Sequence, residues 1–361
     1  MSNEVISESG KRRVAVIGAG AWGTAVAKAC AENGHQVSLW ALEKETVASV
    51  NNDHVNALWL PGVQLPENLS ATGDPAEAAQ DKDIIILAVP SLYLLPTLKR
   101  ILGVRNVMEG SSIIAVVTKG FIETNRGTRL IVETLEDYLP GFYRGNLVYI
   151  SGPSHAEEVS RGLMTGLVAA SNNGRNAIRL RETLQRPYLL VYPSLDVIGV
   201  QVCGGVKNVV AIAFGMLDSL KANSDSFGDN TESLLLAAGL NEIQMLGQAL
   251  GATHPETFTS IAGVGDLDVT CRSVHGRNRR FGRDIVEKNI LQQFSSAEDL
   301  ITNIAKLPYL PEGAVAASFV RKIASDKKLN LPICLGVYRI LNRELGPEEF
   351  AREFLTSLVS R

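Results

Sequence analysis

The chain has 361 residues, more than an average single domain contains, and we therefore expect two domains. Hydrophobic residues make up 45% of it and charged residues 20%, a composition that supports a full core and excludes a disordered chain. The net charge of -3 argues against nucleic acid as the main partner.

The cysteines and histidines indicate neither a disulfide framework nor a metal site. The five histidines are scattered, and the four cysteines show no C-x-x-C spacing. Apolar runs such as Ile84–Val89 are strand-sized and fall short of the roughly 20 residues that a membrane span requires. The N-terminus, Met1–Gly10, is polar and lacks an apolar signal core. We expect a soluble cytoplasmic protein with no metal and no membrane span.

A glycine-rich turn lies near the N-terminus, between a predicted strand and a predicted helix. The strand Arg13–Ile17 ends in Gly18-Ala19-Gly20-Ala21-Trp22-Gly23, the helix Ala25–Asn33 follows with Gly34 as its C-cap, and Gln36–Trp40 is the next strand. The order strand, G-x-G-x-x-G, helix within about 30 residues is typical of dinucleotide binding. The glycines allow a tight turn, and a pyrophosphate can lie against the amides and dipole of the helix N-terminus.

The first half of the chain continues to alternate between strands and helices. Continuous apolar runs indicate a largely parallel sheet covered on both faces, and the alternation predicts a doubly wound, Rossmann-like α/β fold. Ligands bind outside the carboxyl ends of such strands, where Thr118–Gly120 and Ser151–Ser154 are expected, although both can be ordinary solvated turns. The other expected strands are Asp83–Val89, Ser112–Val117, Asn146–Ile150, Thr165–Ala170 and Leu189–Tyr192, and the helices are Leu92–Leu102, Thr128–Tyr138 and Ala177–Gln185.

After about residue 195 the strand signal stops, so we expect a nucleotide-binding domain over 1–195 and an all-helical domain over 196–361. The stretch Gly199–Leu220 is apolar on nearly every face and predicts a buried helix. It nevertheless contains Lys207, and lysine is rarely buried without a partner. The preceding Gly204-Gly205 pair lets another backbone or a ligand approach closely. Lys207 is therefore either a lysine that snorkels from a core helix or an acid or base in a dry cleft.

Two later segments contribute an acid and a group of arginines. Ile261–Leu267 is a glycine-rich turn that presents Asp266. Cys271–Arg283 is rich in arginine, which is typical either of a solvated helix face or of an anion site, because a guanidinium matches phosphate oxygens. Ala222–Thr231 is expected to form a polar loop before the helix Glu232–Leu250, and 331–361 to form amphipathic helices.

Six of these motifs, in this order, resemble those of the NAD(P)-dependent glycerol-3-phosphate dehydrogenases, and the resemblance spans essentially the whole chain. It implies a dinucleotide-binding domain and an all-helical domain, with the active site in the cleft between them. It also implies reversible, NAD(P)-dependent hydride transfer between dihydroxyacetone phosphate and sn-glycerol 3-phosphate, which feeds phospholipid synthesis. The motifs are Gly18–Ala25, Thr118–Gly120, Ser151–Ser154, Gly205–Val209, Gly263–Leu267 and Gly276–Gly282.

The same resemblance implies roles for individual residues. Lys207 is the catalytic acid or base, Lys119 stabilises the alkoxide and helps to lower the pKa of Lys207, and Asp266 orients both lysines. Arg277, with the amides near Asn278, holds the substrate phosphate away from the reacting carbon. The implied substrate contacts are Lys119, Gly152, Ser154, Lys207, Asp266, Gly276, Arg277 and Asn278. The implied cofactor contacts are Gly18, Gly20, Ala21, Trp22, Gly23, Leu42, Lys119, Ala156, Arg277, Leu310 and Glu312.

The chain departs from the bacterial members of that family at three places. The arginine on the helix after the buried one is replaced by Ala238, and the loop Ala222–Asp229 is a few residues longer. The basic residue that many relatives carry after the second strand is replaced by Leu42, with Glu43 next to it and Lys44 beyond. An acid at this place favours the 2′-hydroxyl of NAD over the 2′-phosphate of NADP, so the sequence predicts a preference for NADH.

Two other functions stay open at this stage. A 3-hydroxyacid or 6-phosphogluconate type dehydrogenase also carries a lysine on a long helix between domains, but lacks the Gly-Arg-Asn-Arg-Arg segment here. A non-catalytic redox sensor that binds NADH would need an output module, which the sequence does not indicate. The expected partner is a small-molecule substrate, and a homodimer is the assembly considered.

Overall fold

The computed structural model describes residues 10–222, 225–274 and 276–359, and its contacts divide the chain into two compact units. Unit 1 comprises the described residues of Met1–Thr118 and Val132–Val197, and unit 2 those of Lys119–Ile131 and Ile198–Arg361. The predicted domain boundary between residues 195 and 196 stays a prediction. The assignment of 119–131 to the second unit was not predicted. Some residues of the predicted segments lie outside the described residues: the polar N-terminus up to residue 9, and residues 223–224, 275 and 360–361.

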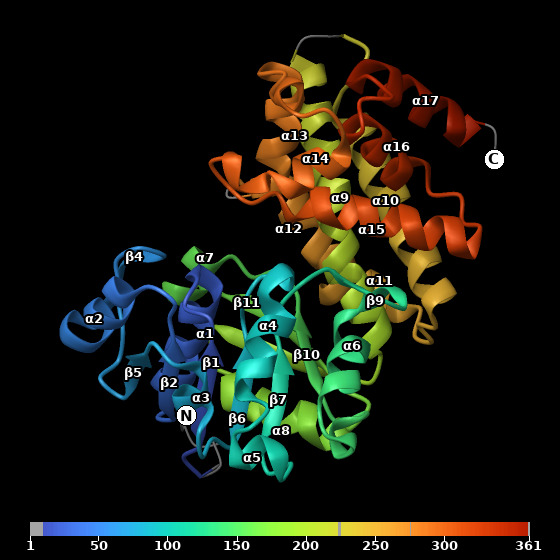
Figure 1. Ribbon diagram of the computed structural model, residues 1–361. Coiled ribbons are helices and arrows are strands. Elements are labelled where there is room, and N and C mark those ends of the chain that lie inside the picture. Colours follow the sequence, from blue (N-terminus) through green and yellow to red (C-terminus); the bar gives the residue numbers. More distant parts are fainter. Residues whose placement is uncertain (1–9, 223–224, 275, 360–361) are drawn as a thin grey trace, which may run out of the picture. The chain divides into compact units, whose positions relative to one another are not determined.

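Unit 1 is built on an eight-stranded sheet in the order β12-β11-β10-β7-β6-β1-β2-β5, which Figure 1 shows with helices packed on it. All neighbouring pairs are parallel except β10 and β11. The central strands are buried on both faces, as their continuous apolar runs predict. The strands are β1 (Arg13–Ile17), β2 (Gln36–Trp40), β5 (Leu69–Thr72), β6 (Ile84–Leu87), β7 (Ile113–Val116), β10 (Val148–Ser151), β11 (Thr165–Ala170) and β12 (Leu189–Ser194).

The four helices that the sequence predicts in unit 1 are present with shifted ends, and four further α-helices among its described residues were not predicted. Helix α1 begins at Ala21 rather than at Ala25, because the chain enters the helix directly after Gly20. Gly34, with φ +82°, takes the left-handed conformation expected after the helix. The helices of unit 1 are α1 (Ala21–Glu32), α2 (Lys44–Asp53), α3 (Pro75–Ala79), α4 (Ser91–Ile101), α5 (Arg105–Met108), α6 (Ile131–Tyr138), α7 (Ala156–Ser160) and α8 (Gly174–Leu184), with the 3-10 turn η1 (Gly141–Tyr143).

Several short strands have no counterpart in the sequence analysis. In unit 1 these are β5 and the pair β3 (Val55–Asn56) and β4 (Leu60–Gln64). In unit 2, β8 (Phe121–Thr124) and β9 (Gly127–Leu130) form a two-stranded hairpin. The predicted helix Thr128–Tyr138 is therefore wrong in its first turn, because those residues pair with β8 and the helix begins at Ile131.

The hairpin packs within unit 2 through one aromatic anchor and one ion pair. Phe121 is buried in the same hydrophobic core as the long helix α9 (Val197–Ala222). The centre of its ring lies 6.4 Å from that of Phe319, in an edge-on arrangement. Lys322 Nζ lies 2.9 Å from the carboxylate of Glu123. Burial of the phenylalanine is the larger effect, because an exposed ion pair contributes little. These contacts explain why 119–131 belongs to unit 2.

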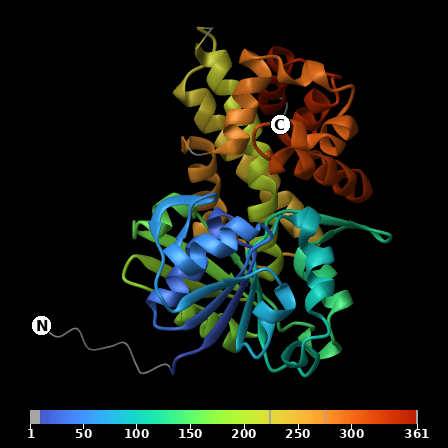
Figure 2. The same cartoon turned by 60° about the vertical axis from the view of Figure 1, so that its left-hand side comes forward.

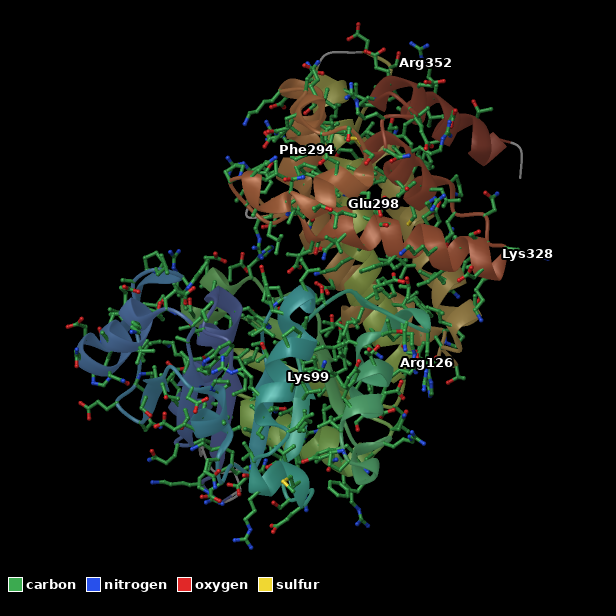
Figure 3. The ribbon with its side chains drawn as sticks, viewed as in Figure 1. Lys99, Arg126, Phe294, Glu298, Lys328 and Arg352 are labelled. Atoms are coloured by element: carbon green, nitrogen blue, oxygen red, sulfur yellow. The ribbon has the colours of Figure 1, made fainter. Side chains whose placement is uncertain are left out.

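Apart from this hairpin, the described part of unit 2 is helical. Helix α9 (Val197–Ala222), yellow-green in Figures 1 and 2, lies among the other helices in both views, and Phe294, labelled in Figure 3, is buried in the same core. The others are α10 (Asp229–Leu250), α11 (Glu256–Thr259), α12 (Asp266–Arg272), α13 (Arg277–Glu287), α14 (Ala297–Thr302), α15 (Glu312–Lys327), α16 (Pro332–Leu341) and α17 (Pro347–Val359), with a π-helical turn η2 (Ile261–Gly265) and 3-10 turns η3 (Ile290–Gln293) and η4 (Ile304–Lys306).

Helix α9 contacts two neighbouring helices backbone to backbone. A β-carbon at Gly215 would lie 1.9 Å from the carbonyl oxygen of Arg279 on α13, and one at Gly282 would lie 2.1 Å from that of Ile212. A β-carbon at Gly313, in the first turn of α15, would lie 2.4 Å from the carbonyl oxygen of Asn208. Only glycine permits these distances, because the clashing atoms belong to backbone that cannot rotate away.

Helix α9 and the acidic, histidine and cysteine side chains are the features that bear on a membrane span and on a metal site. Helix α9 is long and apolar enough to cross a membrane by composition, but 94% of its apolar window is buried inside the protein, as in a core helix. No group of three or more His, Cys, Asp or Glu side chains that could hold a metal occurs among the described residues. All four cysteines are buried free thiols: Cys30, Cys203, Cys271 and Cys334.

Candidate active site

Three predicted residues of unit 2 meet in one buried cluster. The ammonium groups of Lys207 and Lys119 donate to the two carboxylate oxygens of Asp266, the second over 3.1 Å. The side chain of Asp266 is fully buried, that of Lys207 is 8% exposed and that of Lys119 is 16% exposed. Lys207 therefore ends on a buried carboxylate, and the interpretation that it snorkels to the surface is wrong.

Glycines bring the three side chains together. Gly205 of α9 faces the hairpin, since a β-carbon there would meet the ring of Phe121 at 3.0 Å and Gly120 at 3.4 Å. Gly120 has φ +111°, which places it in a region that favours glycine. Asp266 is the first residue of α12, directly after the turn η2, where Gly263 packs against the carbonyl oxygen of Phe258.

The electrostatics of the cluster favour a lysine that can exchange its proton near neutral pH. Burial is the main cause and lowers the pKa of Lys207 from 10.5 to about 7; Asp266 opposes this shift, and the like charge of Lys119 adds to it. Burial alone would raise the pKa of Asp266, but the two lysines outweigh it, and the pKa falls below 3.8. Asp266 therefore stays ionised while Lys207 can give up or take a proton, which is what an acid or base in catalysis requires.

Arg277 differs from the other arginines around it. Arg272, Arg279, Arg280 and Arg283 each have an acidic partner within 4.0 Å. Arg277 is exposed at the first position of α13, and no acidic side chain among the described residues lies that close to it. An unpaired guanidinium at a helix N-terminus can take an anion, because helix dipole and guanidinium favour the same charge. An exposed guanidinium fits a solvated basic face as well as an anion site, so the anion site at Arg277 stays a prediction.

Asn278 follows Arg277 but its side chain already has a partner within the protein. Its Oδ1 accepts the backbone N–H of Gly313 over 2.8 Å, and the residue is 8% exposed. This contact was missed by the sequence analysis, because nothing local marks two residues that far apart as neighbours. Gly276 precedes the helix as its N-cap residue. Leu310 and Glu312 flank Pro311, directly before and at the start of α15, and are half-buried.

The glycine turn of unit 1 has the shape that a dinucleotide requires. Gly18 has φ +126°, and a β-carbon there would lie 2.8 Å from the carbonyl oxygen of Ala88; one at Gly23 would lie 1.9 Å from that of Gly18. At Gly20, by contrast, a β-carbon would meet nothing within 4 Å, so this face of the turn is open. The turn is closed against the protein and open at the N-terminus of α1, where Ala21 and Trp22 are half-buried, so the residues fit a pyrophosphate.

The remaining predicted residues also lie at strand ends of unit 1. Gly152 follows β10 with φ +129°, and a β-carbon there would lie 2.8 Å from the carbonyl oxygen of Gly166. Ser154 donates its hydroxyl to the carbonyl oxygen of Gly152 over 2.9 Å, and Ala156 begins α7, which packs against α1. Leu42 follows β2 and is 74% exposed. The ligand contacts predicted for these residues stay predictions.

The chain departs from the family that it resembles at Ala238 and in the loop between α9 and α10, and side chains near both places have partners within unit 2. Ala238 is half-buried and packs against the core of unit 2. Glu232, near the start of α10, is 7% exposed, and its carboxylate lies 3.0 Å from Nζ of Lys221. Lys221 also pairs with Asp229, so the ends of α9 and α10 are joined across the loop.

A doubly wound unit with an open glycine turn, together with a buried lysine cluster and an unpaired arginine, defines the class of nicotinamide-dependent oxidoreductases. Two sequence models match the chain, described as NAD-dependent glycerol-3-phosphate dehydrogenase N-terminus over residues 13–177 and C-terminus over residues 196–352. The chain belongs to the NAD-dependent glycerol-3-phosphate dehydrogenase family.

Relatives match over nearly their whole length. A glycerol-3-phosphate dehydrogenase [NAD(P)+] from Treponema denticola is 53% identical over 349 residues, which cover 95% of this chain and 98% of the relative. The enzyme of that name from Enterococcus faecalis is 34% identical, with 96% of each chain covered. The crystal structure of glycerol-3-phosphate dehydrogenase from Coxiella burnetii is 32% identical, with a TM-score of 0.81, and covers 96% of this chain and 99% of its own.

The cluster predicts that Asp266→Asn strongly destabilises the protein, because two buried ammonium groups lose their counter-charge. At about pH 7 the free energy of unfolding should fall by about 3–5 kcal/mol. In the wild type Asp266 raises the pKa of Lys207, which is nevertheless about 7, so removal of the carboxylate lowers that pKa further. Below about pH 7 the wild type holds Lys207 charged and gains from the carboxylate, whereas above about pH 7 Lys207 is neutral in both folded proteins and this part of the deficit is lost. The deficit, measured by urea denaturation, should therefore be smaller at about pH 9 than at about pH 6.

Two variants control this experiment. Asp268→Asn removes a half-exposed carboxylate from the same helix, one that pairs with Arg272 over 2.8 Å, and should cost less than about 1 kcal/mol. Adding Lys207→Met to Asp266→Asn removes one of the uncompensated charges and should restore part of the lost stability. A deficit in Asp266→Asn no larger than that of the control would contradict the electrostatic account.

Proposed function

We propose that the protein catalyses the reversible reduction of dihydroxyacetone phosphate by NAD(P)H to sn-glycerol 3-phosphate, which supplies glycerophospholipid synthesis. The observation that carries this proposal is the buried cluster of Lys207, Asp266 and Lys119 in a chain that belongs to this family throughout. The relatives carry the name of this activity. These matches favour neither a 3-hydroxyacid or 6-phosphogluconate type dehydrogenase nor a redox sensor.

In this reaction Lys207 serves as the proton donor to the ketone. The glycine turn after β1 would hold a reduced nicotinamide cofactor, which would supply the hydride to the carbonyl carbon, so that negative charge develops on the carbonyl oxygen. Lys207 holds a proton at Nζ and transfers it to that oxygen, which leaves a neutral amine that later takes up a proton. Lys119 stabilises the developing charge as a second ammonium, and Asp266 holds both lysines in place through its two oxygens.

The phosphate of the substrate is held by Arg277 and by the backbone at the N-terminus of α13. The guanidinium is free to form a bidentate pair, and the dipole of the helix favours the same anion. Gly276 and Asn278 contribute main-chain groups in this proposal, and the side-chain oxygen of Asn278 accepts the backbone N–H of Gly313. Gly152 and Ser154 complete the substrate contacts, and Gly18, Gly20, Ala21, Trp22, Gly23, Leu42, Lys119, Ala156, Arg277, Leu310 and Glu312 contact the cofactor.

The first test is oxidation of NADH with dihydroxyacetone phosphate by the wild type and by Lys207→Ala. The variant should fold and bind NADH normally, because Asp266 keeps Lys119 as a partner. Its kcat should fall by about 10²–10⁴-fold, the usual contribution of general acid catalysis. Lys221→Ala, which removes a half-buried lysine at the end of the same helix, is the matched control and should keep its kcat. Turnover of Lys207→Ala within a few-fold of wild type would end the assignment of the proton donor.

Arg277→Ala should weaken capture of the phosphate and raise KM for dihydroxyacetone phosphate strongly. Unphosphorylated dihydroxyacetone, already a poor substrate, should be much less affected, because it has no phosphate to lose. Arg283→Ala removes another exposed arginine of the same helix, paired with Glu287, and should leave both substrates unchanged. Equal losses on both substrates in Arg277→Ala would show that this arginine serves the fold or the cofactor instead.

The preference for NADH rests on the residues after β2. Leu42 is 74% exposed, so an apolar side chain occupies the place where a 2′-phosphate needs a basic one. Glu43 is the N-cap residue of α2, which places a carboxylate beside it. Lys44, the first residue of α2, is exposed and is the nearby cation that can compensate. A carboxylate favours a ribose hydroxyl over a phosphate, so NADH is the preferred cofactor.

The preference should appear as a kcat/KM for NADH that exceeds that for NADPH by at least several-fold, or about 1 kcal/mol. Leu42→Arg should narrow or reverse the ratio by improving NADPH alone, whereas Leu42→Met, of similar size and without charge, should leave it unchanged. Equal or better efficiency of the wild type with NADPH would refute the preference, and Leu42→Arg should then change little.

We also propose that the protein forms a homodimer and lies in the cytoplasm.

A further inference from the structure

The segment Tyr309–Gly313 is joined to helix α13 at two points. Near the start of α13, Oδ1 of Asn278 accepts the backbone N–H of Gly313 over 2.8 Å, and both residues are buried. Further along the same helix, the carboxylate of Asp284 accepts the hydroxyl of Tyr309. A segment bonded at both of its ends to one helix cannot shift along that helix without breaking a hydrogen bond.

The contact at Tyr309 is supported on two further sides. The guanidinium of Arg280, one helical turn before Asp284, lies 4.8 Å from the centre of the Tyr309 ring. The second oxygen of Asp284 lies 2.8 Å from Nζ of Lys288, and the carboxylate is 6% exposed. Burial would raise the pKa of Asp284, but its hydrogen bonds and charged neighbours lower that pKa, so the acceptor stays ionised.

The same segment also touches the helix that carries Lys207. A β-carbon at Gly313 would lie 2.4 Å from the carbonyl oxygen of Asn208, the residue after Lys207. The start of α15 is thus in backbone contact with α9 at the residue after Lys207 and is hydrogen-bonded to α13 at the residue after Arg277. One short segment connects the proposed proton donor with the proposed phosphate anchor.

We propose that Asn278 and Tyr309 are positioning residues, which fix the distance between the phosphate-binding end of α13 and Nζ of Lys207. The inference rests on the proposed function, because it needs a substrate with a ketone at one end and a phosphate at the other. Phosphate binding speeds the reaction only if the anchored substrate places its carbonyl oxygen at the lysine, and a misplacement of about 1 Å can cost about 100-fold. The side chain of Asn278 acts on Gly313 and not on the phosphate.

The test compares dihydroxyacetone phosphate with unphosphorylated dihydroxyacetone in Asn278→Ala and Tyr309→Phe. With the phosphorylated substrate, kcat should fall about 10- to 100-fold in Asn278→Ala and several-fold in Tyr309→Phe, because the anchor no longer aligns the ketone. With dihydroxyacetone, assayed at saturating NADH because Leu310 and Glu312 of the same segment are proposed cofactor contacts, both variants should lose much less of kcat, since no phosphate aligns this substrate. Tyr309→Phe removes only the hydroxyl and keeps the aromatic ring beside Arg280. It should therefore fold, and it tests the inference even where Asn278→Ala fails to fold.

Tyr338→Phe is the matched control. Its ring, on α16, also lies 4.8 Å from an arginine, Arg321 of α15. Neither residue belongs to the segment Tyr309–Gly313, so the variant should match wild type on both substrates. A rise in KM for dihydroxyacetone phosphate with unchanged kcat in Asn278→Ala would show that the side chain binds phosphate directly, and would overturn the inference. Equal losses on both substrates, or no loss in Tyr309→Phe, would also overturn it. Failure of the wild type to reduce dihydroxyacetone phosphate would instead refute the proposed function.

Discussion

A single buried carboxylate, that of Asp266, has to neutralise two lysines that come from two other parts of the chain. An ionised group without water is costly unless it is paired and hydrogen-bonded, so this cluster forms only if the hairpin, α9 and α12 meet at one point. The same burial lowers the pKa of Lys207 toward neutrality. The feature that makes the cluster expensive to fold is therefore the one that makes its lysine useful to chemistry.

The meeting point depends on close contact between backbones. Glycines at 215, 282 and 313 let α13 and α15 reach α9 without a side chain between them, and Gly205 leaves room for the ring of Phe121 from the hairpin. Contacts between backbones vary less than contacts between long side chains, because they have no rotamers to change. Helix α9 carries the proposed proton donor and also sets the places of α13, which bears the arginine, and of α15. Packing and the proposed catalysis thus share one helix.

Periodicity and turn chemistry predicted much of the fold. The strands Arg13–Ile17, Gln36–Trp40 and Thr165–Ala170 end where their apolar runs end, because buried strands require those runs on both faces. The hairpin β8–β9 was missed because each strand has only four residues and mixes apolar with polar side chains, although Phe121, Ile122 and Leu130 are buried. The start of α1 was missed because Ala21 and Trp22 carry no capping signal after Gly20.

For the site, the sequence by itself determined the residue types and their order: the glycine turn after β1, a lysine in an apolar helix, an acid after a glycine-rich turn and an arginine-rich segment. Each of these is a local pattern. Only the tertiary structure decided that both lysines share the two oxygens of Asp266, that Arg277 alone among its neighbours lacks an acidic partner in the described chain, and that Asn278 is bonded to Gly313. Such pairings join residues far apart in the chain, and they depend on how the helices pack, which no local pattern encodes.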